Sequence, residues 1–187
     1  MAYLTENELK ELGLKKIGSN VKISSKASIY NPELIEIGDN SRIDDFCILS
    51  GKIKIGRNVH VTPFCLLAGG DEGIILEDFT TLAYGVIVFT RSDDYSGETL
   101  TNSTIPIKYR YKTMKARVIA KRFSIIGTRS VIFPGVIIEE GTAVGAMSLV
   151  NKSTEPWSIY VGVPARKIKD RSKDLLKQFQ EYIESNE

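Results

Sequence analysis

The sequence predicts a mainly β protein, a parallel β-helix built on a repeat of six residues. Aliphatic side chains recur every six positions, first at Ile37, Ile43, Leu49, Ile55, Val61 and Leu67. They recur again at Ala120, Ile126, Ile132, Ile138, Val144 and Val150. Six is a poor period for an α-helix, whereas three strands of six residues close one triangular coil. One coil cannot bury its apolar face alone, so stacked coils supply a continuous core. A β-sandwich would instead alternate with period two.

Three interruptions break the repeat, near 31–36, 68–74 and 91–117. After the second interruption we expect the inward series to resume at Ile75, Thr81 and Ile87. The same spacing is found earlier at Ile17, Ile23 and Ile29. A mostly small set follows four positions later and fits the corners of the coil: Val21, Ala27, Ser41, Cys47, Val59, Cys65, Gly85, Ser124, Ser130, Val136, Thr142 and Ser148. Roughly six coils fit into the chain.

Both ends of the chain are predicted to be helical. Thr5 and Glu8 fit a capping box, and Gly13 can end the short helix that follows. Near the other end, one helix face carries Leu175, Leu176, Phe179, Tyr182 and Ile183. We expect both helices to pack against the prism.

We therefore expect a single domain, 1–187, with an N-terminal cap (1–16), the β-helix (17–155) with its loop 91–117, and a C-terminal tail and helix (156–187). A net charge of +2 gives no general attraction to nucleic acid or an anionic membrane. No apolar run approaches the ~20 residues of a membrane span, and the first residues do not resemble a signal peptide. These features predict a cytoplasmic protein with reduced thiols.

Two cysteines, Cys47 and Cys65, lie eighteen residues apart, which is one whole coil. They should therefore stack at the distance between neighbouring strands, about 5 Å. We expect no disulfide, because the repeat already explains small residues at both positions. A catalytic cysteine is not expected at these core or corner positions.

Two segments carry a family pattern: 126–150, with its Pro-Gly-Val element, and 161–168, with Gly-Val-Pro-Ala-Arg. Both resemble the hexapeptide-repeat acyltransferases, in the branch of galactoside and maltose O-acetyltransferases and bacterial surface-sugar acetyltransferases. The resemblance covers about residues 17–169. It implies a left-handed β-helix, a homotrimer, and acetyl-CoA bound in a groove between neighbouring prisms.

On the matching positions, the resemblance implies coenzyme A contacts from Thr128, Ala146, Asn151, Lys152, Arg166 and Lys169. A small residue such as Ala146 lets the pantetheine arm approach the backbone. The cations can pair with phosphates, an arginine bidentately. Taken singly, each cation could equally be solvated surface.

The family's usual catalytic histidine, at the start of the long loop, is absent. Asp93 stands at the matching position, within one residue. A sugar hydroxyl needs a base such as imidazole, whereas a neutral amine attacks a thioester unaided. Asp93 or Asp94 could orient a substrate ammonium and receive its proton, which favours an amino-sugar N-acetyltransferase. Both residues also suit a plain loop turn.

Acceptor contacts are expected from His60, Thr62, Asp71, Glu72 and Arg110. His60 is the single histidine and could instead lie on the surface; one histidine argues against a zinc enzyme and no metal is expected. Asp71 and Glu72 could equally form a solvated turn.

Residues 108–117 of the loop interleave cations with tyrosines, which can clamp a diphosphate and stack on a base or sugar. Binding of nucleic acid is a weaker interpretation of this segment. A further alternative is that the segment packs on a neighbouring subunit and is solvated.

The sequence thus predicts an acetyl-CoA-dependent acetyltransferase of a small-molecule sugar, with an amino sugar on a nucleotide favoured, in surface-polysaccharide biosynthesis. The alternatives are a sugar O-acetyltransferase, an antibiotic or amino-acid acetyltransferase, and a non-catalytic scaffold. No nucleic-acid partner and no membrane span are expected.

Overall fold

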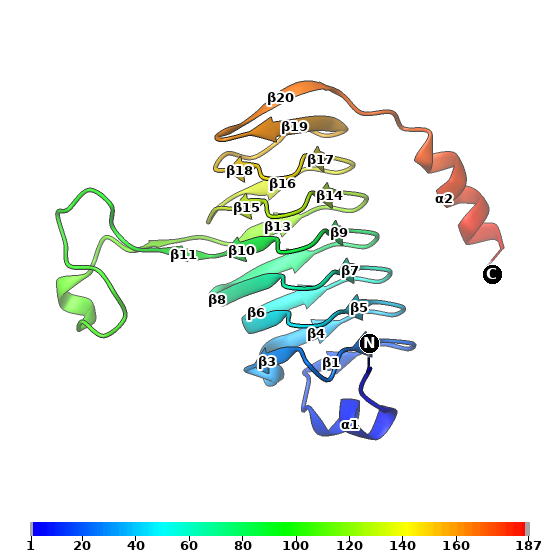
Figure 1. Ribbon diagram of the computed structural model, residues 1–187, viewed down its shortest axis with the longest axis horizontal. Helices are drawn as coiled ribbons and strands as arrows, with labels where there is room; N and C mark the ends of the chain where they lie inside the picture. The colour runs from blue at the N-terminus through cyan, green and yellow to red at the C-terminus, as the bar shows by residue number, and fades with distance from the viewer. Residues whose placement is uncertain (1, 186–187) are drawn as a thin grey trace.

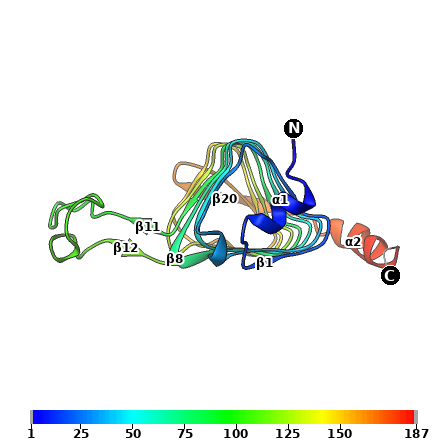
Figure 2. The ribbon, with the colours of Figure 1, turned by 90° about the horizontal axis from the view of Figure 1, so that it is seen from below.

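A computed structural model describes residues 2–185 as a parallel β-helix of triangular cross-section (Figures 1 and 2). Each turn contains three short strands, and each strand pairs in parallel with the corresponding strands of the turns below and above. Six turns are complete, and Ser158–Gly162 (β19) begins a partial seventh. The fold class is therefore confirmed.

The first face of the prism consists of β1 (Lys16–Ile17), β4 (Ile35–Ile37), the second halves of β6 (Ile48–Ile55) and β8 (Leu66–Leu76), β13 (Val118–Ala120) and β16 (Ile137–Ile138). The second face consists of β2 (Lys22–Ile23), β5 (Arg42–Ile43), β7 (His60–Val61), β9 (Thr81–Leu82), β14 (Ile125–Ile126), β17 (Ala143–Val144) and β19. The third face consists of β3 (Ser28–Tyr30), the first halves of β6 and β8, β10 (Ile87–Phe89), β15 (Val131–Ile132) and β18 (Leu149–Val150).

The core is the inward series that the repeat predicts, with one correction. Ile37, Ile43 and Leu49 are buried, as are their counterparts in the upper turns. After the second interruption, however, the buried residues are Leu76, Leu82 and Val88, each one position beyond the prediction. Thr81 and Ile87 face outward, because the insertion lengthens that turn to put Leu82 directly above Val61. Consecutive apolar residues, Ile74 to Leu76, left the phase of the repeat ambiguous in the sequence.

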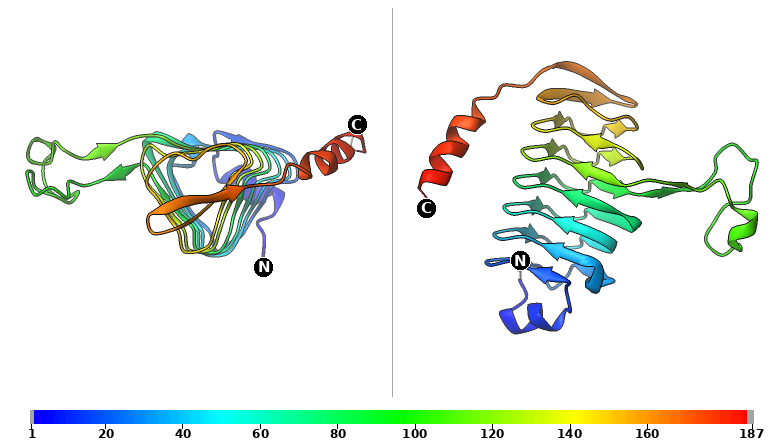
Figure 3. Two further views of the ribbon diagram at one scale, coloured as in Figure 1. Left: turned by 90° about the horizontal axis from the view of Figure 1, so that it is seen from above. Right: turned by 180° about the vertical axis from the view of Figure 1, so that it is seen from behind.

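Both terminal helices pack on the prism, as predicted. The helix α1 (Glu6–Glu11) starts with the predicted capping box of Thr5 and Glu8. The helix α2 (Leu175–Glu184) lies beside the edge between the first and second faces (Figure 3). There Phe179 contacts the rings of Phe79 and Phe123, at centroid distances of 5.2 and 5.0 Å.

The loop 91–117 leaves the edge between the third and first faces as a long hairpin (Figures 1 and 3). Its base is an antiparallel pair, β11 (Arg91–Ser92) with β12 (Met114–Lys115), and its tip contains a short 3₁₀ helix, Ile107–Tyr109. A second 3₁₀ helix, Pro32–Leu34, marks the first interruption. Within residues 2–185, no helix has both the length and the apolar character that a membrane crossing requires.

Candidate active site

Ion pairs fix the base of the hairpin, which we call its root, against the corner of the prism at Gly70. Arg91 Nε donates to Glu72 Oε2 over 3.0 Å, and Arg91 Nη2 donates to Asp71. These groups lie directly over Gly70, where a Cβ would come within 2.8 Å of Arg91 Nε. Burial alone would raise the pKa of Glu72, but the Arg91 guanidinium outweighs it and lowers that pKa. Asp71 and Glu72, predicted to bind the acceptor, therefore orient Arg91 at the edge of the prism.

A cavity of about 490 Å³ opens beside this root. Its lining brings together two predicted residues, Asp93 and Arg110, with Arg91 and four small polar residues: Ser92, Asn102, Ser103 and Thr113. Asp93 Oδ2 accepts a hydrogen bond from the Asn102 N–H over 2.9 Å. A cavity lined by the Asp93 carboxylate and the Arg110 guanidinium can bind an ammonium at one end of a ligand and a phosphate at the other.

Asp94 lies next to this cavity but is engaged in a turn. Its carboxylate accepts hydrogen bonds from the Ser96 N–H and Oγ–H over 2.8 and 2.6 Å, and from the N–H groups of Glu98 and Thr99. These bonds, those of Ser96 first, hold the pKa of Asp94 well below its usual range. Of the two predicted carboxylates, Asp93 is the one that lines the cavity, and Asp94 shapes the turn that presents it.

His60 lies on the second face in a cluster around a buried carboxylate. Asp44, with a side chain only 1% exposed, is 2.8 Å from His60 Nε2 and accepts from Arg42 Nε over 2.7 Å and from the Tyr3 hydroxyl over 3.0 Å. Burial would raise the pKa of Asp44, but the hydrogen bonds from these three residues lower it. The cluster holds Arg42 and His60 rigidly at the prism surface, away from the cavity of the same chain.

Thr62 occupies a different environment from the other predicted acceptor residues. It is 7% exposed, and within residues 2–185 its Oγ1 has no hydrogen-bond partner. It belongs to the interior corner that also holds Cys47, whose thiol donates to the Thr62 carbonyl over 3.1 Å. Cys65 is stacked one turn above, equally buried.

The residues expected to bind coenzyme A are divided between two edges and the upper end of the prism. Thr128 and Ala146 lie at the edge between the second and third faces, in the fifth and sixth turns. Asn151 and Lys152 follow β18 at the opposite edge of the third face, the edge from which the hairpin leaves in a lower turn. Arg166 and Lys169 lie on β20 (Ala165–Asp170), which closes the upper end beside β19. One chain alone therefore does not bring the six residues together.

Several residues of this region were missed by sequence reasoning, among them three with charged or amide side chains. Arg91 and Asn102 line the cavity, and Asp44 anchors His60. Arg91 could have been found from its position, directly after the last strand before the loop. Asp44 carried a weaker signal, a carboxylate at a repeat position where a small or apolar residue is usual.

No family model matches the sequence. The chain is 39% identical over 179 residues to the dTDP-4-amino-4,6-dideoxy-D-glucose acyltransferase of Escherichia coli, and the match covers 94% of this chain and 92% of that protein. A crystal structure of AntD, an N-acyltransferase from Bacillus cereus, with dTDP and 3-hydroxybutyryl-CoA has a TM-score of 0.97 at 48% identity, covering 99% of this chain and 98% of AntD.

A substituted AntD in complex with dTDP-4-amino-4,6-dideoxyglucose and coenzyme A also has a TM-score of 0.97 at 48% identity, covering 98% of each chain. The likeness extends over the prism, the hairpin and both terminal helices, so it is not limited to the common repeat. The chain therefore belongs to the hexapeptide-repeat acyltransferases, in the group that includes AntD and the Escherichia coli acyltransferase.

Proposed function

We propose that this enzyme transfers the acyl group of an acyl-CoA to the amino group of a nucleotide-linked amino sugar, with dTDP-4-amino-4,6-dideoxyglucose as the first acceptor to test. The observation that carries the proposal is the near-full-length likeness to enzymes whose names and complexes specify this sugar. The cavity supports it, because Asp93 suits an ammonium while Arg110 suits a phosphate.

In this reaction the neutral amine attacks the thioester carbonyl, an N–C bond forms, and the C–S bond breaks. The amine nitrogen loses one proton before attack and another after it, and the departing thiolate of coenzyme A can take up the second. Asp93 binds and orients the ammonium and accepts its first proton directly or through water. A neutral amine is nucleophilic enough to attack a thioester without an imidazole base. The proposed reaction therefore does not require the family's histidine.

Three copies of the chain are proposed to form the working enzyme. The outward side chains of the third face are apolar in successive turns: Ile48, Leu66, Ile87, Val131 and Leu149. Ile48 and Ile87 are 40% and 36% exposed in the single chain. An apolar strip of this length is unusual on a monomer and favours contact with further copies. A closed ring with the third faces inward buries all three strips.

Because acyl-CoA and sugar nucleotides are both made in the cytoplasm, we place the reaction there. Its product would be an N-acylated sugar nucleotide, the form in which a glycosyltransferase takes up sugars for a surface polysaccharide. The acyl group is proposed to be acetyl or 3-hydroxybutyryl.

The test is a thiol-release assay with acetyl-CoA and 3-hydroxybutyryl-CoA. Acceptors would be dTDP-4-amino-4,6-dideoxyglucose, the matching sugar nucleotide with a 4-hydroxyl, a free amino sugar, and chloramphenicol. We expect release only with the nucleotide-linked amine, and mass spectrometry should show the acyl group on nitrogen. Faster turnover of the hydroxyl sugar or of chloramphenicol would contradict the proposal.

A further inference from the structure

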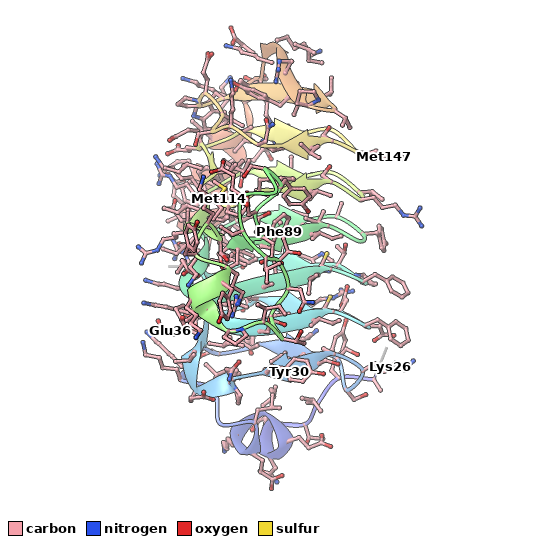
Figure 4. The ribbon with its side chains drawn as sticks, turned by 90° about the vertical axis from the view of Figure 1, so that its left-hand side faces the viewer. Lys26, Tyr30, Glu36, Phe89, Met114 and Met147 are labelled. Carbon is pink, nitrogen blue, oxygen red and sulfur yellow. The ribbon has the colours of Figure 1, made fainter. Side chains whose placement is uncertain are left out.

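The first face of the prism carries three adjoining cavities that are separate from the cavity beside Asp93. Their volumes are about 370, 210 and 190 Å³, and all three are lined by Lys54, so we call them together the Lys54 trough. This face lies between the hairpin and α2 (Figure 2), and Figure 4 shows its Glu36 on the opposite side of the prism from Met147 and Lys26. Within residues 2–185, the linings of the trough and of the Asp93 cavity have no residue in common.

The outward side chains at the centre of the first face change from charged to apolar along the prism. Strand pairing stacks Lys16, Glu36, Lys54 and Ile75 in four successive turns. Ile119 continues this column above Ile75. Lys54 therefore lies at a boundary, with charged residues below it and an apolar surface above it.

Positive charge exceeds negative charge in the part of the trough nearest the hairpin. The cavity of about 210 Å³ is lined by four cations, Lys15, Lys52, Lys54 and Arg117, and by one carboxylate, Glu36. Lys15 Nζ pairs with Glu36 Oε1 at 2.7 Å, and this hydrogen bond, more than the charge of Lys54, lowers the pKa of Glu36. Among residues 2–185, no carboxylate forms an ion pair with the other three cations of this cavity.

Two glycines of the second interruption make room for Lys52. A Cβ on Gly69 would overlap the Lys52 carbonyl oxygen, and a Cβ on Gly73 would lie 3.4 Å from Lys52 Cγ and Cδ. Gly73 also has a φ of 93°, which favours glycine. The aliphatic part of Lys52 therefore lies against the Gly73 backbone, and from there Lys52 lines the cavity.

Arg117 is held in the cavity from the side of the hairpin. Its Nε donates to the Glu72 carbonyl over 3.0 Å, and the Glu72 carboxylate in turn accepts from Arg91 at the root. In the described part of the chain this is the one hydrogen bond of the Arg117 side chain, so its terminal nitrogens remain available to a ligand.

This arrangement has the properties of an anion site. A hollow lined by charges of one sign above an apolar floor concentrates the electric field, and the floor here is formed by the buried Ile53 and Ile74. Lysine ammonium groups bind phosphate as point charges, and an arginine guanidinium binds it bidentately. The whole chain has a net charge of only +2, so this local excess of cations is not a general property of its surface.

We infer that the Lys54 trough binds a small phosphorylated ligand, with its phosphate groups between Lys52, Lys54 and Arg117. The remainder of such a ligand would lie against Ile75 and against Leu34, which is 40% exposed. The inference does not depend on the proposed function, because the trough and the Asp93 cavity are lined by different residues.

Lysine footprinting with pyrophosphate as the probe tests the inference on the native enzyme. Reductive methylation followed by mass spectrometry measures how fast each lysine reacts. Near-saturating pyrophosphate should slow the reaction of Lys52 and Lys54 at least about threefold, since a bound ammonium is not free to react. Lys177 on α2 is the control, because its side chain is 81% exposed and it lies outside the trough. Unchanged rates at Lys52 and Lys54, or equal slowing at Lys177, would overturn the inference.

Calorimetric titration with pyrophosphate tests the role of Lys54 directly. Arg110 of the Asp93 cavity could also bind the probe, so all titrations use the Arg110→Gln background. Adding Lys54→Gln should raise the Kd about tenfold, which is the effect of losing one charge-assisted contact. Lys54→Arg should largely preserve binding, and Lys177→Gln is the control of equal charge change. Equal Kd values for the Lys54→Gln and Lys177→Gln proteins would contradict the site.

Two further measurements separate this site from other roles of the same cations. Lys54→Gln alone should leave the kinetics of acyl transfer unchanged, and a rise in KM for the acceptor with unchanged pyrophosphate binding would instead assign Lys54 to the acceptor. Vesicles containing phosphatidylglycerol should not protect Lys52 and Lys54 from methylation. Protection by vesicles but not by pyrophosphate would overturn the inference and assign the cations to a membrane surface.

Discussion

Asp44 determines how firmly the second face holds Arg42 and His60, and we expect Asp44→Asn to destabilise the protein by about 2–3 kcal/mol. Its buried carboxylate accepts hydrogen bonds from Tyr3, Arg42 and His60. A hydrogen bond to a charged group contributes about 1.5–3 kcal/mol. The side chains of Arg42 and His60 are 39% and 38% exposed, so water replaces much of what they lose. The net loss should therefore be that of about one such bond.

Thermal unfolding at a fixed protein concentration measures this loss, and the midpoint should fall by roughly 4–12 °C for a chain of this size. The control is Asp170→Asn, which removes a surface pair with Lys167 at 2.8 Å and a carboxylate 85% exposed. Exposed pairs contribute about 0–1 kcal/mol, so its midpoint should hardly move.

The pH dependence of this difference has a definite sign. The neighbours of Asp44 lower its folded pKa. Its stabilising effect is therefore complete above the unfolded pKa, about 4, and is lost as the pH falls through the lower folded value. The gap between native protein and Asp44→Asn should shrink on acidification. Equal destabilisation by the Asp44 and Asp170 variants, or a gap that widens in acid, would refute the reasoning.

Three further outcomes are expected. Gly70→Ala should lower kcat/KM by at least about tenfold without unfolding the prism, because the new Cβ displaces Arg91 from the hairpin root; unchanged kinetics would argue against that role. Chemical denaturation should show that Leu82→Asn lowers the free energy of unfolding by about 3–5 kcal/mol and Thr81→Asn by about 0.5 kcal/mol, because Leu82 is buried and Thr81 faces outward. A larger loss for Thr81→Asn would mean that Thr81 is the inward residue, as the repeat predicted. Arg171→Ala should speed proteolysis of α2 while sparing the prism, since its guanidinium donates to two main-chain carbonyls of the prism at 2.9 Å and burial lowers its pKa.

The repeat predicted the prism well because burial imposes it at every turn. Ile126 and Ile132 could be placed inward with no knowledge of the partners above or below them. The prediction was wrong directly after the second interruption, where an insertion breaks the six-residue period. At Ile74 to Leu76, three apolar residues in a row satisfy either phase, and only pairing with the turn below selects Leu76.

The site was harder to predict, for a physical reason. Asp93 and Arg110 line one cavity, and both could be proposed from the sequence, Asp93 from its match to the position of the family's histidine and Arg110 from the cations and tyrosines around it. Asp44 contacts Tyr3 and His60 in other turns, so its role depends on stacking that no local pattern encodes. Gly85 was assigned to a small-residue corner slot, whereas Val86 occupies the buried position and Gly85 stands outside it.

The hairpin is inserted between two turns of the prism, and these turns still stack directly on each other. Leu82 and Ile126 are paired neighbours although forty-four residues separate them, and Val88 and Ile132 are paired across the same excursion. The insertion therefore interrupts one corner of the prism, and the turns below and above it still pair with each other. Evolution can therefore exchange such a segment while leaving the stacked turns of the prism intact. The same junction offers protein engineers a place to graft a hairpin from a relative.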